Sequence, residues 1–228
     1  MLPEALPPHA QPWALVHADD AIVVLNKPSG LLAVPGKTSD HCLSSLVQAQ
    51  FPDALIVHRL DMSTSGLMLM ARGAAAQRLL NAAFAERRVH KRYVAIASGD
   101  CRESESHAGD AWQTIDLPIM VDWPNRPRRK IDLELGKPSS TRWRTLHFDA
   151  ARNATRLELE PLSGRSHQLR VHLQAIGHPI LGDALYAPAP IAEASPRLLL
   201  HAAELGFAHP ATGAWTSFVL ADGFDAQA

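Results

Sequence analysis

Residues 58–66, with the sequence HRLDMSTSG, limit most narrowly how this chain folds. Short apolar runs flank them, residues 55–57 before and residues 67–70 after. Apolar runs separated by a small polar turn that ends in glycine indicate two strands joined by a tight connection. The pattern therefore predicts strand, turn and strand, with Asp61 held where the chain leaves the core. A carboxylate in that position suits a nucleophile or a base, and it suits a structural ion pair equally well.

A second polar segment, residues 161–170, opens a predicted helix. Ser166 is a suitable N-cap, apolar residues then recur at helical spacing, and Gly177 ends the run. This reading places Arg165 at the helix N-terminus, where the helix dipole disfavours a cation. An aspartate brought close would relieve the conflict by pairing with the guanidinium. The alternative is that the Arg165 side chain points into water.

Composition restricts the class of protein. The chain has 228 residues and a formal net charge of −1, so any nucleic-acid site must be a local basic patch. Cys42 and Cys101 share no motif, which fits a reducing compartment better than a disulfide framework. The first ten residues do not resemble a signal peptide, and no apolar run is long enough to span a bilayer. We therefore expect a cytoplasmic protein that is monomeric and not attached to a membrane.

The order of the predicted elements indicates an α+β fold, because strand patterns outnumber helical ones and short links join many of them. We expect a mixed, mainly antiparallel sheet with a few flanking helices. The predicted strands are residues 21–25, 93–97, 114–120, 139–148, 154–161, 198–207 and 217–220, and further helices are residues 40–50 and 74–88. Residues 100–113 and 186–196 are predicted loops. We expect a loosely ordered N-terminal arm over residues 1–12, a single domain over residues 13–221 and a tail over residues 222–228.

Several catalytic signatures are missing from the sequence. It contains no phosphate-binding loop, no dinucleotide-binding glycine turn and no nucleophile elbow. Its twelve histidines and two cysteines form no common metal-ligand pattern. We therefore expect chemistry carried out by side chains alone, with no metal and no cofactor.

Residues 58–66 and 164–170 together resemble the signature segments of the RluA family of pseudouridine synthases. Residues 26–30, the pair Lys91 and Tyr93 at the start of a strand, and residues 177–183 agree with the same family. The similarity extends from about residue 13 to about residue 220. Three other stretches are similar to a short member of the family that modifies both ribosomal and transfer RNA: residues 123–127, 136–138 and 197–201.

The resemblance implies a pseudouridine synthase fold with a central cleft, and the isomerisation of specific uridines in 23S rRNA, in the anticodon stem-loop of tRNA, or in both. It implies that Asp61 is the essential catalytic aspartate, that Arg165 pairs with it and that Tyr93 lies against the target base. Arg59 is similar to the family residue that enters the RNA where the base has flipped out. The alternatives are a structural pair between Arg59 and Asp61, and a buried strand aromatic at Tyr93. Some relatives carry an N-terminal accessory RNA-binding domain, and we expect none here.

Structured RNA is therefore the expected partner, and two basic clusters are candidates for phosphate contact. The first, with Trp123 beside it, contains Arg126, Arg128, Arg129 and Lys130. The second contains Arg87, Arg88, Lys91 and Arg92. A run of charges is more often a solvated face than a binding site. In a nearly neutral chain, however, local clustering favours RNA contact for the first cluster.

Two other functions remain compatible with these residues. A glycosidase or nucleoside hydrolase would use Asp61 as nucleophile with an acid partner such as Glu160 or Asp183. A binding module without catalysis would use the same basic surface on RNA. The first would release free uracil or a reducing sugar, and the second would leave the RNA unchanged.

Overall fold

The computed structural model describes residues 13–36, 39–102 and 112–224. Contacts divide the chain into two compact units: Met1–His90 with Ala202–Asp222, and Lys91–His201 with Gly223–Ala228. The predicted arm, residues 1–12, and most of the predicted loop at residues 100–113 lie outside the described residues. A single domain over residues 13–221 stays a prediction.

The first unit is a sheet with two helices. Its strands are β1 (Ala14–Ala18), β2 (Ile22–Lys27), β3 (Ala54–Ile56), β4 (Ser65–Arg72), β12 (Trp215–Val219) and most of β11 (Leu200–Ala208), and its helices are α1 (Leu43–Gln48) and α2 (Gly73–Ala85). The strand order is β1-β2-β4-β11, with β3 beside β4 and β12 beside β11. The pairs β1–β2, β2–β4, β3–β4 and β11–β12 are antiparallel.

The core of the first unit follows from two nearly continuous apolar strands. β2 and β4 are buried along most of their length, as expected of strands covered on both faces. Helix α2 places Ala76, Leu80 and Ala83 at helical spacing against this sheet, where they join a cluster with Leu67 and Leu69. The turn that carries Asp61 therefore begins and ends in well-packed structure.

The second unit contains a four-stranded sheet, a small two-stranded sheet and two helices. Its elements are β5 (His90–Ser98), β6 (Gln113–Asp116), β7 (Ile119–Val121), β8 (Arg129–Ile131), β9 (Ser140–Asp149), β10 (Ala154–Pro161), α3 (Gln168–Ala175) and α4 (Ala189–Ala192). The order β5-β10-β9-β6 is antiparallel throughout, and β7 pairs antiparallel with β8. Helix α3 contributes Leu169 and Leu173 to a core shared with Leu157 and Leu159 of β10.

The predicted α+β fold, a mainly antiparallel sheet with few helices, is confirmed, and two of the predicted elements need correction here. The single strand expected at residues 114–120 is two strands, β6 and β7, separated by Pro118, which cannot donate to a sheet ladder. The loop expected at residues 186–196 contains the short helix α4. Strand β1 was not predicted: it contains the short apolar run of residues 14–16, but as an edge strand it leaves most of these side chains exposed.

In the described ranges, no helix is both long enough and apolar enough to cross a lipid bilayer.

Candidate active site

Asp61 lies in the connection between β3 and β4, so the predicted strand, turn and strand are confirmed. Its side chain is half-buried, whereas Leu60 and Thr64 on either side are buried and anchor the turn. The amide N–H of Thr64 donates to the carbonyl oxygen of Asp61 at 3.1 Å. Gly66 closes the segment with a φ of +111°, and a Cβ there would lie 2.4 Å from the carbonyl oxygen of Ala202. The turn therefore requires a glycine at this position.

A buried lysine holds the turn from beneath. Lys27, at the end of β2, has no exposed surface. Its ammonium donates three hydrogen bonds to main-chain carbonyls: Pro28 at 2.8 Å, Leu31 at 2.7 Å and Met62 at 2.9 Å. An ammonium has three N–H donors, so all of them are used. The residue after Asp61 is thereby fixed to the end of β2.

Two further bonds join the same segments. The hydroxyl of Ser29 donates to the carbonyl of Ser63 at 2.7 Å, and the amide of Gly30 donates to the carbonyl of Met62 at 2.9 Å. Residues 27–30 are thus a support for the Asp61 turn. The sequence-based predictions treated residues 26–30 as a strand-ending turn and did not single out Lys27. A lysine placed between an apolar run and a proline was the available signal.

Burial lowers the pKa of Lys27 to about 7, and the negative charge of Asp61 opposes this shift. The Asp61 carboxylate is therefore close enough to attract the Lys27 ammonium electrostatically. A lysine with a depressed pKa beside a carboxylate is a common feature of functional sites. This pair therefore supports an active-site role for the turn as well as a structural one.

His58 and Arg59 have different surroundings at the start of the segment. The Nε2 atom of His58 accepts the amide N–H of Leu69 at 2.9 Å, and its ring stacks on Phe84 with centroids 4.7 Å apart. His58 therefore fixes the segment to β4 and α2. The next side chain, Arg59, is exposed.

The segment around Arg165 differs from its prediction. Helix α3 begins at Gln168, and its N-cap is His167 in the left-handed conformation with a φ of 58°, not Ser166. Arg165 therefore lies in a turn before the helix and not in its first turn, so the expected conflict with the helix dipole does not arise. Its side chain is exposed, and its Nε donates to the carbonyl of Pro138 at 3.3 Å. The end of the helix is as predicted, with Gly177 in the left-handed conformation just beyond it.

Gln168 explains why the turn forms this way. Its side chain is buried, with 4% of the residue exposed, and its amide makes four hydrogen bonds. The Oε1 atom accepts from the Arg165 amide at 3.0 Å and from the Ser163 hydroxyl at 2.8 Å, and Nε2 donates to the Ser140 carbonyl and the Thr141 hydroxyl, both at 3.0 Å. A fully satisfied buried amide fixes its neighbours strongly. Gln168 therefore attaches the Arg165 turn to β9.

Tyr93 lies in β5, opposite Leu159 of β10, and packs against the core of the second unit while half-buried. Asp61 and Arg59 belong to the first unit, and Tyr93, Arg165 and the first basic cluster belong to the second. The pairing of Asp61 with Arg165 and the role of Tyr93 stay predictions.

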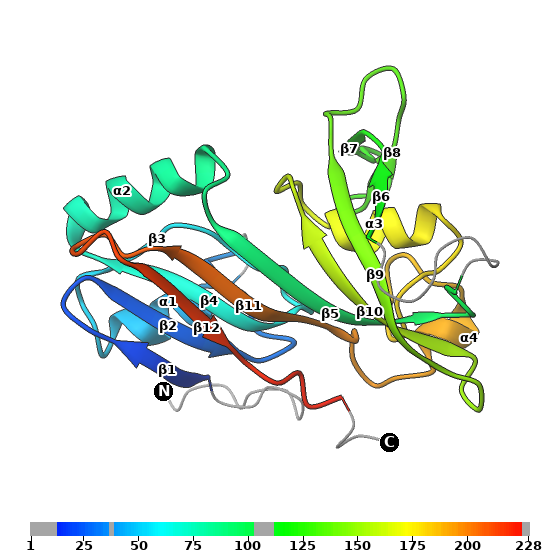
Figure 1. Ribbon diagram of the computed structural model, residues 1–228, viewed down its shortest axis with the longest axis horizontal. Coiled ribbons are helices and arrows are strands. Elements are labelled where there is room, and N and C mark those ends of the chain that lie inside the picture. Colours follow the sequence, from blue (N-terminus) through cyan, green and yellow to red (C-terminus); the bar gives the residue numbers. More distant parts are fainter. Residues whose placement is uncertain (1–12, 37–38, 103–111, 225–228) are drawn as a thin grey trace. The chain divides into compact units, whose positions relative to one another are not determined.

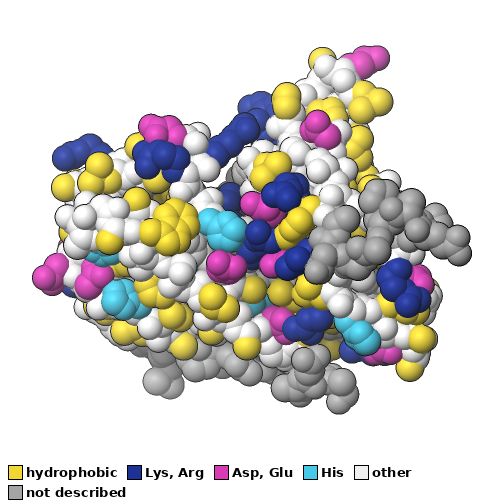
Figure 2. Space-filling view, in the orientation of Figure 1, with side chains coloured by type: hydrophobic (Ala, Val, Ile, Leu, Met, Phe, Trp, Pro, Cys, Tyr) yellow, Lys and Arg dark blue, Asp and Glu magenta, His cyan; other side chains and the backbone are white. Residues whose placement is uncertain are grey.

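Most cations of the first basic cluster have partners within the protein. Arg128 donates through Nε to the Leu185 carbonyl at 2.6 Å, and Lys130 pairs with Asp132 at 3.3 Å. Arg126 is different, because its guanidinium lies over an aromatic ring, that of Trp123. Figure 2 shows Lys and Arg side chains with Asp and Glu side chains among them.

Two arginines of the second cluster are engaged in ion pairs. Arg92 lies 3.4 Å from Glu158 and 3.8 Å from Glu160, and Arg88 lies 2.7 Å from Glu86. Lys91 is half-buried. These contacts favour a structural role for Arg88 and Arg92 over phosphate binding.

Both acid partners considered for a hydrolase are held by arginines. Glu160 lies 3.1 Å from Arg142, and Asp183 accepts two hydrogen bonds from Arg170, at 2.6 and 2.8 Å. Asp183 is 1% exposed. Both carboxylates therefore already serve as the ion-pair partners of arginines within the second unit. This geometry argues against a two-carboxylate hydrolase.

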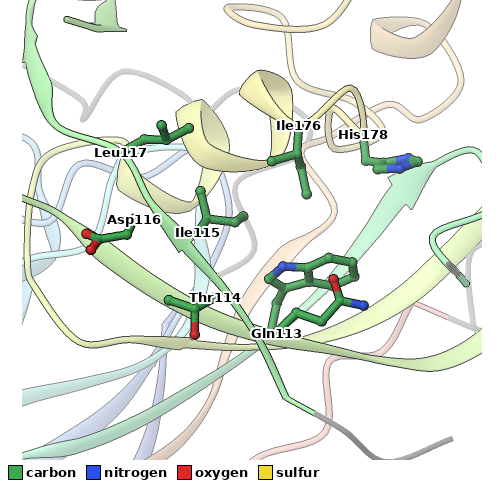
Figure 3. A pocket seen from close by; sticks show the side chains of 8 residues that line it. Gln113, Thr114, Ile115, Asp116, Leu117, Ile176 and His178 are labelled. Carbon is green, nitrogen blue, oxygen red and sulfur yellow. The ribbon is translucent and has the colours of Figure 1, made fainter. Parts of the chain in front are cut away.

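A hollow of about 330 Å³ lies beside β6 and the end of α3 (Figure 3). Ile115 and Ile176 face it from the strand and the helix, with Asp116 and His178 among its polar residues. None of the predicted catalytic residues lines it. Among the described residues, no group of three or more His, Cys, Asp or Glu side chains is arranged to hold a metal ion.

Comparison with known proteins defines the class. The family described as RNA pseudouridylate synthase matches residues 21–175. The dual-specificity RNA pseudouridine synthase RluA of Escherichia coli O6:H1 is 47% identical over 209 residues, covering 90% of this chain and 92% of that protein. RluA of Pasteurella multocida is also 47% identical, covering 90% of each chain. The structure of human RNA pseudouridylate synthase domain containing 1 matches 96% of this chain and 87% of that chain, with a TM-score of 0.79 and 29% identity.

This chain therefore belongs to the RNA pseudouridylate synthases, a class of isomerases that convert uridine to pseudouridine. Within that class it is a member of the RluA family, as the signature segments predicted.

Proposed function

We propose that this synthase modifies specific uridines in both ribosomal and transfer RNA, with Asp61 as its essential catalytic carboxylate. The observation that carries the proposal is the support of the Asp61 turn by Lys27, Ser29 and Gly30. A catalytic group must be held within fractions of an ångström, and a turn fixed by main-chain hydrogen bonds meets that need. The dual range is supported by the name that the curated relatives carry.

The reaction is an isomerisation and needs no co-reactant. The bond from the sugar to N1 of uracil breaks, the ring turns, and C5 bonds to the same sugar carbon. C5 then loses its proton and N1 carries one in the product, so the atoms balance. Asp61 attacks the sugar, attacks the base or removes a sugar proton. In each route the turn presents a half-buried carboxylate to the flipped nucleotide.

The other predicted residues take roles around that carboxylate. Arg165 pairs with Asp61, and Tyr93 lies against the uracil ring. Flipping a base costs a few kcal/mol, and the exposed planar guanidinium of Arg59 offsets part of this by stacking where the base had been. Lys91 and the first basic cluster contact phosphates. The enzyme acts as a monomer in the cytoplasm, which fits its two buried free cysteines.

The test is an incubation of the purified protein with total RNA from a strain that lacks it, followed by base-resolution mapping of pseudouridine. New pseudouridine in a tRNA anticodon stem-loop and in 23S rRNA supports the dual range. Modification of one RNA class alone rejects the dual range and keeps the reaction. The matched pair of variants is Asp61→Ala, expected to be inactive, and Asp20→Ala, an exposed carboxylate of the same unit, expected to be active. Turnover by Asp61→Ala at the wild-type rate would overturn the assignment of Asp61.

A further inference from the structure

Trp123 is an exposed aromatic residue with a cation stacked against it. It is 62% exposed, and the guanidinium carbon of Arg126 lies 3.4 Å from its ring centroid. The apolar cluster beneath this region is formed by Ile119, Val171 and Tyr186 and does not include Trp123. The larger core cluster of the second unit does not include Trp123 either, so its ring presents a flat apolar face to solvent. Folding of the second unit therefore does not account for this side chain.

The loop that carries Trp123 is closed on itself. The amide of Asp122 donates to the carbonyl of Arg128 at 3.1 Å, and the amide of Arg128 donates to the carbonyl of Asn125 at 2.9 Å. The side-chain amide of Asn125 also donates to the Asp122 carboxylate at 2.9 Å. These bonds hold the loop in one conformation before any ligand arrives, which lowers the entropy lost on binding.

The loop is also fixed to the segment that carries Arg165. Arg128 donates to the Leu185 carbonyl, and the amide of Arg129 donates to the hydroxyl of Tyr186 at 2.8 Å. The same hydroxyl lies 2.6 Å from Nδ1 of His167, two residues after Arg165. Figure 1 shows β7 and β8 next to α3, in agreement with these bonds. The exposed tryptophan and the predicted catalytic arginine therefore share one support.

We propose that Trp123 and Arg126 form a stacking platform for one unpaired base of the RNA substrate. Every base has a π-face, so an aromatic ring binds unpaired bases without reading sequence, and an arginine beside it adds cation–π attraction and a phosphate contact. A base inside a duplex is already stacked and cannot use the platform. The platform therefore selects loops over helices. This inference rests on the proposed function in one respect: it takes RNA as the ligand.

The experiment compares binding of two probes to the full chain. One probe is a stem-loop transcript with the sequence of a tRNA anticodon arm, and the other is the same stem as a blunt duplex. Stacking of one base on an aromatic side chain corresponds to about 5- to 150-fold in Kd. We expect Trp123→Ala to raise the Kd of the stem-loop within that range and to leave the duplex unchanged. Trp123→Phe keeps a smaller ring and is expected to lose less.

Two variants separate stacking from charge and from general surface change. Arg126→Lys keeps the charge and loses the planar stack, so it is expected to weaken stem-loop binding while leaving the salt dependence of Kd unaltered. Leu133→Ala is the control, because Leu133 is also an exposed apolar residue, 79% exposed, but lies on the turn after β8. It is expected to bind both probes as the wild type does.

Wild-type Kd of the stem-loop for Trp123→Ala and Trp123→Phe would overturn the platform. Equal weakening for stem-loop and duplex would also overturn it, since that result indicates a duplex contact. Failure of the proposed function gives a different result: the wild type would produce no pseudouridine while the Trp123 variants still lost affinity for the stem-loop.

Discussion

The ammonium of Lys27 lies 2.9 Å from the carbonyl oxygen of Met62, the residue that follows Asp61. The two residues are 35 positions apart in the sequence, so this bond joins the end of β2 to the turn that carries Asp61. The cost is a charge with no exposed surface. Burying a cation without a directly paired carboxylate lowers the free energy of unfolding. Such a cation is therefore expected only where it has a specific structural or functional role. Here the Lys27 ammonium fixes the turn that carries the Asp61 carboxylate.

Replacing this lysine should damage activity far more than stability. Lys27→Met removes the buried charge, which stabilises the folded state by roughly 5 kcal/mol. This figure follows from the lowering of the Lys27 pKa from 10.5 to about 7. The carbonyls left without a donor cost about 1–3 kcal/mol each. These terms nearly cancel, so we expect the free energy of unfolding to change by less than about 2 kcal/mol. The single-turnover rate constant for pseudouridine formation should fall at least tenfold. Loss of the ammonium lets the Asp61 carboxylate shift, and a displacement of about 1 Å at a reacting group has effects of this size.

Denaturant unfolding and single-turnover kinetics on Lys27→Met test this expectation. The matched control is Lys137→Met, because Lys137 is an exposed lysine on the other unit. An active Lys27→Met enzyme would show that the ammonium is not needed to position Asp61.

Stability should depend on pH through the same residue. The folded-state pKa of Lys27, about 7, is below its ordinary value of 10.5, so between these values the unfolded chain binds more protons than the folded one. The contribution of Lys27 to the free energy of unfolding therefore rises with pH across this window, and below the window the full cost of the buried charge is present. Relative to Lys27→Met, the wild type should gain roughly 2–3 kcal/mol between about pH 6 and about pH 9.

Urea unfolding of both proteins at the two pH values measures this difference, and all other titrating groups cancel in the comparison. A difference that is the same at both pH values would mean that Lys27 keeps its ordinary pKa in the folded protein.

Gly66 should tolerate no side chain. A Cβ at this position would lie 2.4 Å from the carbonyl oxygen of Ala202, and the φ of +111° is itself strained for any other residue. The nearest atoms are all main-chain atoms of Ala202 in the adjacent strand β11, so they cannot move without shifting that strand. We expect Gly66→Ala to lower the free energy of unfolding by about 2–4 kcal/mol, measured by denaturant titration.

The control for this prediction is Gly213→Ala in the turn between β11 and β12. Gly213 has a φ of +73° and open space where a Cβ would be, so only the backbone strain remains, about 1–2 kcal/mol. Equal losses in the two variants would show that the close approach at Ala202 contributes nothing.

The difference between predicted and observed structure has a consistent physical cause. The runs that form β2 and β4 are apolar enough for their periodicity to predict them, and the Asp61 turn follows from its composition. Strand β1 contains only the short apolar run of residues 14–16, and its edge position leaves these side chains exposed. The start of α3 was mispredicted because a tertiary bond decides it: Gln168 reaches back to the Arg165 amide and across to β9. The role of Lys27 was missed for the same reason, since its acceptor at Met62 is remote in sequence.

Gln168 should therefore control the Arg165 turn without touching the RNA. Gln168→Ala removes four hydrogen bonds and takes the acceptor from the Arg165 amide and from the buried Ser163 hydroxyl. We expect a loss of about 2–4 kcal/mol in the free energy of unfolding, because buried groups are left unsatisfied. We also expect kcat to fall by about tenfold or more, while the Kd for substrate RNA changes little. Gln174→Ala is the matched control, an exposed glutamine on the same helix, and should be neutral in all three measurements. A Gln168→Ala enzyme that is less stable but has the wild-type kcat would contradict this prediction. It would show that the Arg165 turn keeps its position without the Gln168 side-chain amide. Other contacts of the turn, such as the bond from Arg165 to the Pro138 carbonyl, would then have to fix its geometry.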